Sequence, residues 1–245
     1  MLSGPAWLAL EVKDLASVRP FYESTLGLPV VREDPAGGEV AYGAGETDLV
    51  LREPGPVPRG ALHVHYAFSI PPASYDDWWA HLSTEFDLEE HNFGSMSSLY
   101  CYDPVCNCVE LGQDEGVADR AAVESDGPAG VDGPIAGVFE VVLEVEDLAR
   151  AEHFYDRLGF EVVDRGEERR RVRMSIGALD LELWEPHLGL ADARGGVHVD
   201  LGLATPEPAR LAGKVSGQAS AVTDPGRGKR VRDRDGHWIT LVPQE

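Results

Sequence analysis

Two histidines stand two residues apart in the segment LHVHYAF, at positions 63 and 65. The pattern predicts a strand, in which residues two apart face the same side. An imidazole on such a face can ligate a divalent metal or transfer a proton near neutral pH. His63 has a counterpart, His198, in the similar segment VHVDLGL, which favours a structural role for it. The residue that matches His65 there is Asp200, so His65 is the stronger candidate for chemistry.

Carboxylates occur inside two apolar strand patterns. Glu140 lies in FEVVLEV, where an unpaired inward carboxylate would cost free energy. Strand alternation puts Glu144 on the same face, so either both side chains point into a solvated cup or that face is the outer one. Glu182 lies between two leucines in LDLELWEP, and alternation leaves it on either a solvent face or the cup face.

The other reactive residues have simpler interpretations. Cys101, Cys106 and Cys108 crowd into one strand-turn-strand segment, whereas a disulfide framework would be even in number and spread out. No second group of cysteines or paired histidines at ligand spacing accompanies them, so we predict buried, reduced thiols. The basic run Arg169–Arg171 with Arg173 predicts a solvated hairpin in an acidic protein.

The elements that carry these residues occur twice. Four blocks of sequence recur in the same order, which indicates a duplicated domain. The matched blocks are 10–31 with 143–163, 48–54 with 180–186, 62–68 with 197–203, and 103–111 with 233–241. We predict one domain at 1–113, a linker rich in Gly, Asp and Ala at 114–134, and a second domain at 135–245.

Each copy begins with an alternating strand, at 7–12 and at 139–145. Asp14 and Asp147 then stand at N-cap positions before an amphipathic helix, and Gly27 and Gly159 supply its left-handed C-cap. Short β-rich segments follow, and a second strand-helix-strands unit begins at 62 or 197. The sequence therefore predicts two β-α-β-β-β units per copy, an α+β fold.

Acidic residues dominate the composition. The net charge is −22, with 43 acidic against 21 basic residues, which argues against nucleic acid or an anionic membrane as partner. Acidity spread along both copies suits a surface adapted to high salt. No apolar stretch approaches the roughly 20 residues of a membrane span, and a signal-peptide pattern is absent. We expect a soluble cytoplasmic protein.

These motifs resemble the vicinal oxygen chelate superfamily of glyoxalase I, extradiol dioxygenases and bleomycin-resistance proteins. The matching pieces are the opening strand followed by [KE]DL and a helix with FY then LG, the LHVHYAF strand, and the DPVCNCVEL ending. The resemblance covers nearly all of both copies outside the linker. It implies two tandem glyoxalase-like domains, in each of which two β-α-β-β-β units form a curled eight-stranded sheet that commonly holds a divalent metal.

The resemblance also implies four ligand positions per copy. Carried onto this chain, they are Trp7, Val50, His65 and Glu110 in the first copy, and Glu140, Glu182, Asp200 and Thr240 in the second. Neither set is complete. Glyoxalase I-like members pair the first half of one domain with the second half of its neighbour. That pairing gives one full metal site, made of His65, Glu110, Glu140 and Glu182, and one depleted site.

Such a site would hold Ni, Co, Zn, Mn or Fe(II), and the sequence does not choose among them. We predict Glu110 as the base that removes a substrate proton and Glu140 as the acid that returns it. Glu110 could instead be an exposed strand-end carboxylate. Candidate residues of the substrate pocket are Trp7, His63, Trp184 and Asp200.

Three functions remain open. The first is a metal-dependent glyoxalase I-like lyase or isomerase with one active site shared between the domains. Glu144 stands where glyoxalase I carries an arginine for a glutathione carboxylate, which argues against a glutathione adduct. The second is an extradiol dioxygenase, which requires two histidines and one carboxylate. The third is a metal-free protein that sequesters a small molecule. The partner is in each case a small molecule, and the chain is either a monomer with an internal pseudo-dimer or a homodimer.

Overall fold

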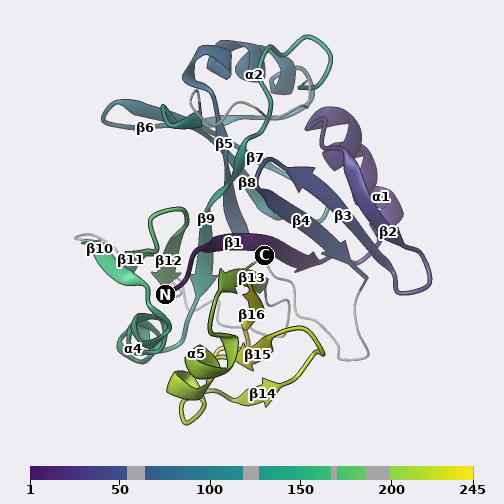
Figure 1. Ribbon diagram of the computed structural model, residues 1–245. Coiled ribbons are helices and arrows are strands. Elements are labelled where there is room, and N and C mark those ends of the chain that lie inside the picture. The colour runs from purple at the N-terminus through teal and green to yellow at the C-terminus, as the bar shows by residue number, and fades with distance from the viewer. Residues whose placement is uncertain (54–63, 118–126, 167–169, 186–198, 245) are drawn as a thin grey trace. The chain divides into compact units, whose positions relative to one another are not determined.

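The computed structural model describes residues 1–53, 64–117, 127–166, 170–185 and 199–244 (Figure 1). Four β-α-β-β-β modules follow one another along the chain. The first consists of β1 (Gly4–Glu11), α1 (Leu15–Pro20), the π-helix η1 (Phe21–Thr25), β2 (Val30–Asp34), β3 (Glu39–Ala44) and β4 (Thr47–Arg52). The second consists of β5 (His65–Ile70), η2 (Pro72–Ser74), α2 (Tyr75–Leu82), β6 (Glu89–Phe93), β7 (Met96–Tyr102) and β8 (Cys108–Gln113).

The second copy repeats this order. Its first module consists of β9 (Gly137–Glu144), α4 (Leu148–Leu158), β10 (Glu161–Arg165), β11 (Arg171–Ser175) and β12 (Asp180–Trp184). Its second module consists of β13 (Asp200–Thr205), α5 (Pro208–Val215), β14 (Ala221–Thr223), β15 (Lys229–Arg232) and β16 (Trp238–Pro243). The predicted α+β class and module order are confirmed.

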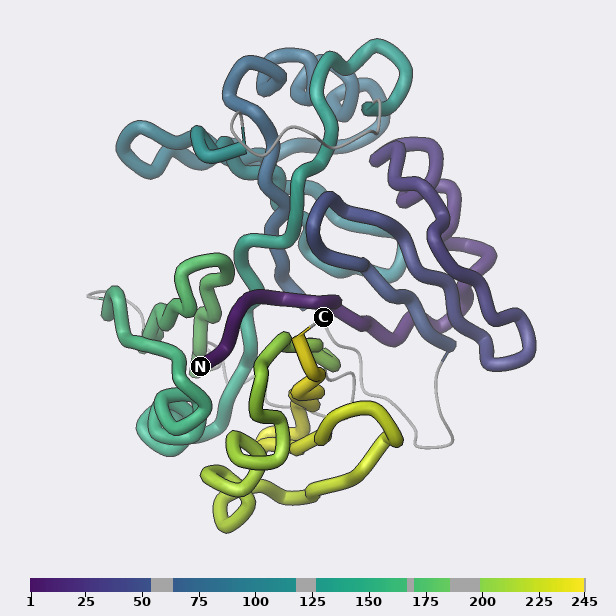
Figure 2. The backbone as a smooth tube through the Cα atoms, in the orientation of Figure 1, coloured from purple at the N-terminus to yellow at the C-terminus, as the bar shows by residue number. Residues whose placement is uncertain are grey.

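The strands form two eight-stranded sheets. Their orders are β14-β15-β16-β13-β1-β4-β3-β2 and β10-β11-β12-β9-β5-β8-β7-β6. Each sheet therefore takes one module from each copy, which confirms the exchanged pairing of halves that the resemblance implied. In the path of the backbone, the N-terminal strand β1 runs beside β13 of the second copy (Figure 2).

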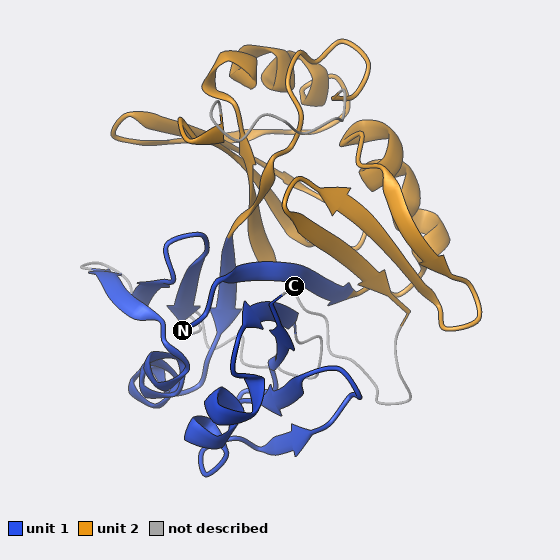
Figure 3. Cartoon of the chain, in the orientation of Figure 1, with its two compact units in different colours: residues 1–10, 55–62, 140–245 blue, residues 11–54, 63–139 orange. Residues whose placement is uncertain are grey.

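The chain also divides into two compact units (Figure 3). The first comprises Met1–Leu10, Gly55–Leu62 and Glu140–Glu245, and the second Glu11–Pro54 and His63–Phe139. Strand β1 thus belongs almost entirely to the unit that holds the second copy. The boundaries of the two sequence domains, at 1–113 and 135–245 with a linker between them, remain a prediction.

The predicted caps are present in both copies. The Asp14 carboxylate accepts a hydrogen bond from the Ala16 amide at 3.0 Å, and Gly27 has a left-handed φ of 68°. In the second copy, the Asp147 carboxylate accepts a hydrogen bond from the Arg150 amide at 3.0 Å, and Gly159 ends the helix in the left-handed region at φ 116°.

The two copies differ in the helix between the caps. In the first copy, Pro20 interrupts the pattern because it has no amide N–H to donate. The chain continues as the π-helix η1, in which the Leu26 amide bonds to the Phe21 carbonyl at 2.8 Å.

Each module buries one face of its strands against its helix. In the second unit, Tyr66, Phe68, Val109 and Leu111 are fully buried, and Trp78 of α2 is fully buried with them. Burial of large apolar side chains supplies most of the stabilisation of such a layer. The intervening residues of β5 and β8 lie on the opposite face, where alternation places His65 and Glu110.

Candidate functional site

His65 and Glu110 lie together on that opposite face of the second unit. Strands β5 and β8 run parallel, with His65 beside Cys108 and Ala67 beside Glu110. The imidazole Nε2 lies 3.0 Å from Oε2 of the Glu110 carboxylate. His65 is 8% exposed and Glu110 is 4% exposed, so the pair is largely withdrawn from water.

The surroundings of Glu110 keep its carboxylate charged. Burial is the largest single influence and disfavours the charged form, but the interactions with His65, Ser98 and Tyr100 together outweigh it and hold the pKa of Glu110 below its ordinary value. Tyr100 is the residue directly opposite Glu110 on β7, and its ring meets the His65 imidazole edge to face at 5.5 Å between centroids. Glu110 is therefore an ionised, buried carboxylate and not an exposed strand end.

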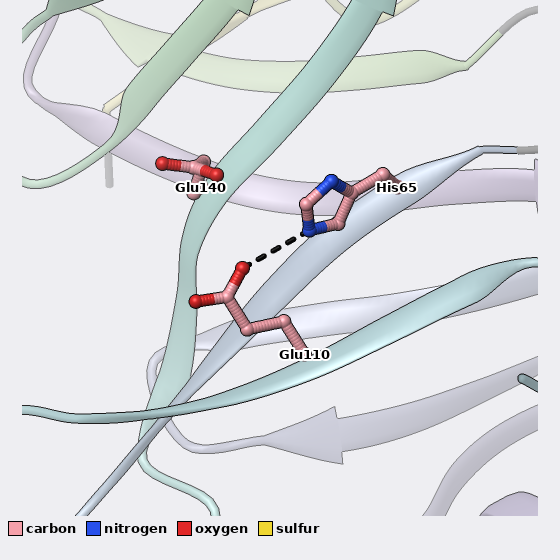
Figure 4. A group of neighbouring side chains, drawn as sticks. All are labelled: His65, Glu110 and Glu140. Carbon is pink, nitrogen blue, oxygen red and sulfur yellow. Dashed lines mark hydrogen bonds and ion pairs between the residues drawn. The ribbon is translucent and has the colours of Figure 1, made fainter. Parts of the chain in front are cut away.

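Glu140 directly follows Phe139, the last residue of the second unit, on strand β9. His65, Glu110 and Glu140 form a group in which each residue offers one ligand atom and all these atoms lie within 4.8 Å of one another (Figure 4). All three side chains are buried. The structure thus brings together three of the four residues predicted as metal ligands.

Glu182 lies outside this group. It is 5% exposed on β12, opposite Arg173 of β11. Its Oε1 accepts hydrogen bonds from Nη1 of Arg171 at 2.7 Å and from Nε of Arg173 at 2.9 Å. Its Oε2 accepts one from the Trp184 indole at 2.7 Å. These donors occupy both oxygens of Glu182. Its role as a metal ligand therefore stays a prediction, and these contacts do not favour it.

The arginines correct one interpretation of the sequence. Arg171 and Arg173 lie on strand β11 of an antiparallel hairpin, but alternation with the buried Val172 and Met174 places their side chains on the face that holds Glu182, and they are only partly exposed. Arg173 also donates to Oε2 of Glu140. Burial lowers the pKa of Arg173, but Glu140 and Glu182 outweigh it and raise that pKa above its ordinary value. The alternation of apolar and basic residues in RVRMS is the sequence signal for this placement.

The depleted set of positions has a different environment. In the first unit, Asp200 accepts a hydrogen bond from the Thr240 hydroxyl at 2.7 Å and pairs with Arg230 at 2.9 Å. The Arg230 guanidinium lies 4.3 Å above the Trp238 ring. The Asp200 carboxylate is therefore paired with a guanidinium and a hydroxyl.

The other candidate pocket residues are placed as follows. Trp7 covers Gly202, where an added Cβ would lie 2.3 Å from the indole ring. Val50 is buried on β4, Trp184 is bonded to Glu182, and His63 lies outside the described residues. Among the described residues, Asp200 is not a member of the group of three described above.

The cysteines are all free thiols. Cys101 and Cys108 are buried, and burial raises the pKa of each to about 12, so neither is a thiolate at neutral pH. Cys106 is exposed at the turn before β8, contrary to the prediction that all three are buried.

Several solved structures match nearly the whole chain. A protein from Bacillus subtilis subsp. subtilis str. 168, named as a candidate dioxygenase, matches with a TM-score of 0.73 at 15% identity, over 99% of this chain and 85% of its own. Glyoxalase I from Zea mays matches with a TM-score of 0.65 at 16% identity, over 98% of this chain and 92% of its own. The chain has the vicinal oxygen chelate fold.

At these identities the likeness is one of fold alone. No model of a protein family matches the sequence, and no curated protein matches it. Among the described residues, no helix combines the length and the apolar character that crossing a membrane requires. The vicinal oxygen chelate fold accounts for the order of the strands, while the function must be argued from the side chains of this chain.

Proposed function

We propose that this protein is a divalent-metal-dependent lyase or isomerase of the glyoxalase I type, with the metal held by His65, Glu110 and Glu140. The observation that carries the proposal is the group formed by these three buried side chains. Buried carboxylates cost free energy unless they are paired or bound to a cation. Two carboxylates and one imidazole that lie this close together form a set of donors that a divalent cation could bind.

The donor types fit such an ion. One imidazole nitrogen and two carboxylate oxygens suit Mn, Fe, Co, Ni or Zn, and three protein ligands leave positions for substrate oxygens. A bound divalent cation would supply Lewis-acid polarisation of a substrate carbonyl. His65 and Glu110 already lie within 3.0 Å of each other, so both are placed to bind one ion.

Glu110 is the proposed base. Its pKa lies below the ordinary value, so it is ionised at neutral pH and able to accept a proton from a substrate carbon beside the carbonyl. Glu140 is the proposed acid that returns the proton. Because Arg173 donates to Glu140, that carboxylate would have to exchange this contact for a proton during turnover.

The composition of the group bears on the two alternatives. An extradiol dioxygenase would use two histidines and one carboxylate, whereas this group has one histidine and two carboxylates. His63, which would have to be the second histidine, lies outside the described residues. A protein that only sequesters a small molecule would have no need to bury two carboxylates around an imidazole.

The test is metal content per chain after purification without chelator, by elemental analysis. We expect about one equivalent in the wild type and a loss of most of it in His65→Ala, Glu110→Gln and Glu140→Gln. His91→Ala is a matched control, because the side chain of His91 is 53% exposed on strand β6, which β7 separates from β8. Absence of metal in the wild type would contradict the proposal and favour a sequestering protein.

The metal-loaded protein then separates the enzyme classes. We expect turnover of α-ketoaldehyde–thiol adducts and no uptake of oxygen with catechols. Glu144 lies half-buried beside Trp184 on the neighbouring strand, and its carboxylate would repel a glutathione carboxylate. Adducts of uncharged thiols are therefore expected to be better substrates than the glutathione adduct. Oxygen uptake with Fe(II) and a catechol would move the assignment to the dioxygenases.

A further inference from the structure

A line of polar contacts crosses three strands of the first unit and ends at Glu140. The order of these strands is β11-β12-β9. Trp184 donates to Oε2 of Glu182 at 2.7 Å, and Arg173 donates through Nε to Oε1 of Glu182 at 2.9 Å. The Nη2 group of Arg173 then donates to Oε2 of Glu140. Every member of this line belongs to the first unit.

Arg173 has to reach past one strand to make the last of these contacts. It lies opposite Glu182 on β12, while Glu140 is on β9, at the other side of β12. Two strand spacings amount to roughly 10 Å, which requires long side chains on both sides. A guanidinium also offers donors in a fixed fork, so its Nε can bond to one carboxylate while Nη2 bonds to another. A lysine has a single, freely rotating ammonium in its place.

Glu182 is better suited to orient a cation than to ligate a metal. Its two oxygens already accept three hydrogen bonds, two of them from guanidinium groups. A metal bound at Glu182 would lie beside two positive charges. Glu182 instead limits the rotation of the Arg173 side chain, which is 37% exposed.

We propose that Glu182 and Arg173 are positioning residues for the metal site: Glu182 orients Arg173, and Arg173 orients Glu140 as a ligand. This inference rests on the function proposed above. Carboxylates that ligate metals are themselves hydrogen-bonded, and the loss of such an outer partner typically weakens metal binding about 10–100-fold. Arg173 bonds to Oε2 of Glu140, and a carboxylate has a second oxygen with which to ligate.

The experiment is a titration of the full-length, metal-free protein with Co²⁺, followed by visible absorption and calorimetry. Arg173→Gln is expected to weaken Co²⁺ binding about 10–100-fold, with partial recovery in Arg173→Lys. Glu182→Gln is expected to weaken it in the same direction and by less, because Arg173 keeps its contact with Glu140. Circular dichroism and thermal unfolding establish that each variant is folded before it is titrated.

Arg171→Gln is the matched control. Arg171 lies on the same strand and pairs with Glu182 and Asp164. Its replacement removes one arginine charge from the same face but leaves the contact between Arg173 and Glu140. We expect a change in Co²⁺ affinity of less than about 3-fold, which lies below the range for direct outer partners.

A double variant separates positioning from a general effect on the fold. If Arg173 acts through Glu140, Arg173→Gln should weaken Co²⁺ binding far less in a Glu140→Gln background than in the wild type. Unchanged or tighter binding by Arg173→Gln would overturn the inference, since Arg173 would then be idle or a competitor of the metal. Equal effects in both backgrounds would overturn it as well. If the wild type itself binds no Co²⁺, the proposed function fails, and the inference fails with it.

Discussion

The Tyr155 hydroxyl donates a hydrogen bond to Oδ2 of Asp233 at 2.8 Å. Tyr155 belongs to helix α4, in the first module of its copy, whereas Asp233 lies in the turn before β16, in the second module. The first copy repeats the contact, because Tyr22 donates to Oδ2 of Asp103 at 2.8 Å. Within each compact unit, a buried tyrosine therefore ties the helix of one module to the last turn of the next.

Removal of this hydroxyl should reduce stability. Oδ1 of Asp233 accepts the amides of Asp235, Gly236 and His237, which leaves Tyr155 as the partner of Oδ2. We expect Tyr155→Phe to lower the free energy of unfolding by about 1.5–3 kcal/mol, as for hydrogen bonds to charged groups. Urea denaturation measures the change. Tyr75→Phe, which removes a part-buried bond to Glu90, should cost less than Tyr155→Phe, and a reversal of that order would contradict the explanation.

Replacement of a strained cysteine should increase stability. Cys106 has a φ of 70°, in the left-handed region, and the matching turn of the second copy has Gly236 with a φ of 105°. A side chain in this region destabilises the folded state by roughly 1–2 kcal/mol, and glycine removes that strain. Glycine also makes the unfolded chain more flexible, which offsets part of the gain. Cys106→Gly is therefore expected to raise the free energy of unfolding by about 0.5–1 kcal/mol. The reciprocal change Gly236→Ala should lower it, and both are measured by thermal unfolding.

Gly202 and Trp7 should behave as a coupled pair. An added Cβ at Gly202 would lie 2.3 Å from the Trp7 ring, so Gly202→Ala forces the indole to move. The expected loss is about 1–3 kcal/mol in the free energy of unfolding. Combined with Trp7→Leu, the same alanine should cost much less. Gly213→Ala in α5 serves as a control, because no atom lies within 4 Å of its added Cβ, and it should stabilise the helix by about 0.5–1 kcal/mol.

Acid should weaken the metal-free protein through Glu110. Its pKa is lower in the folded chain than the ordinary value of about 4.3, so the unfolded state binds its proton first as the pH falls. The stability that the ionised carboxylate contributes is present above about pH 4.3 and is lost as the pH falls through the folded pKa. Urea denaturation between about pH 3 and 7 should show a shallower acid loss in Glu110→Gln than in the wild type. Parallel pH profiles of the two proteins would contradict this account.

The sequence was most informative where the hydrophobic alternation of a segment and its repetition in the second copy indicate the same element. Alternation and the N-caps at Asp14 and Asp147 were enough to predict the order of strands and helices, because both depend on neighbours in the sequence. The repeat, read through the family resemblance, indicated the exchanged pairing of modules. The π-helix after Pro20 was missed, although a proline within a helix is a recognisable signal.

Contacts between side chains on different strands were harder to predict from the sequence. Whether Glu182 faces a metal or an arginine depends on which residue lies opposite it, and the register that pairs it with Arg173 is set only once β11 and β12 are aligned. His65 and Glu110 were easier to associate, because each lies in a motif of the family resemblance, His65 in LHVHYAF and Glu110 in DPVCNCVEL. Cys106 was predicted to be buried because three cysteines crowd into one segment without other metal ligands nearby in the sequence. Its turn needs a residue in the left-handed region, and the thiol is exposed there.

The exchange of modules between the sheets ties the two halves of the duplication together. In the strand order, β1 stands next to β13 and β9 next to β5, so in each sheet a module of one copy joins a module of the other at the centre. A chain shortened to one copy would leave the edges of two half-sheets uncovered, and such edges promote association. Neither copy could therefore be deleted without loss of both sheets.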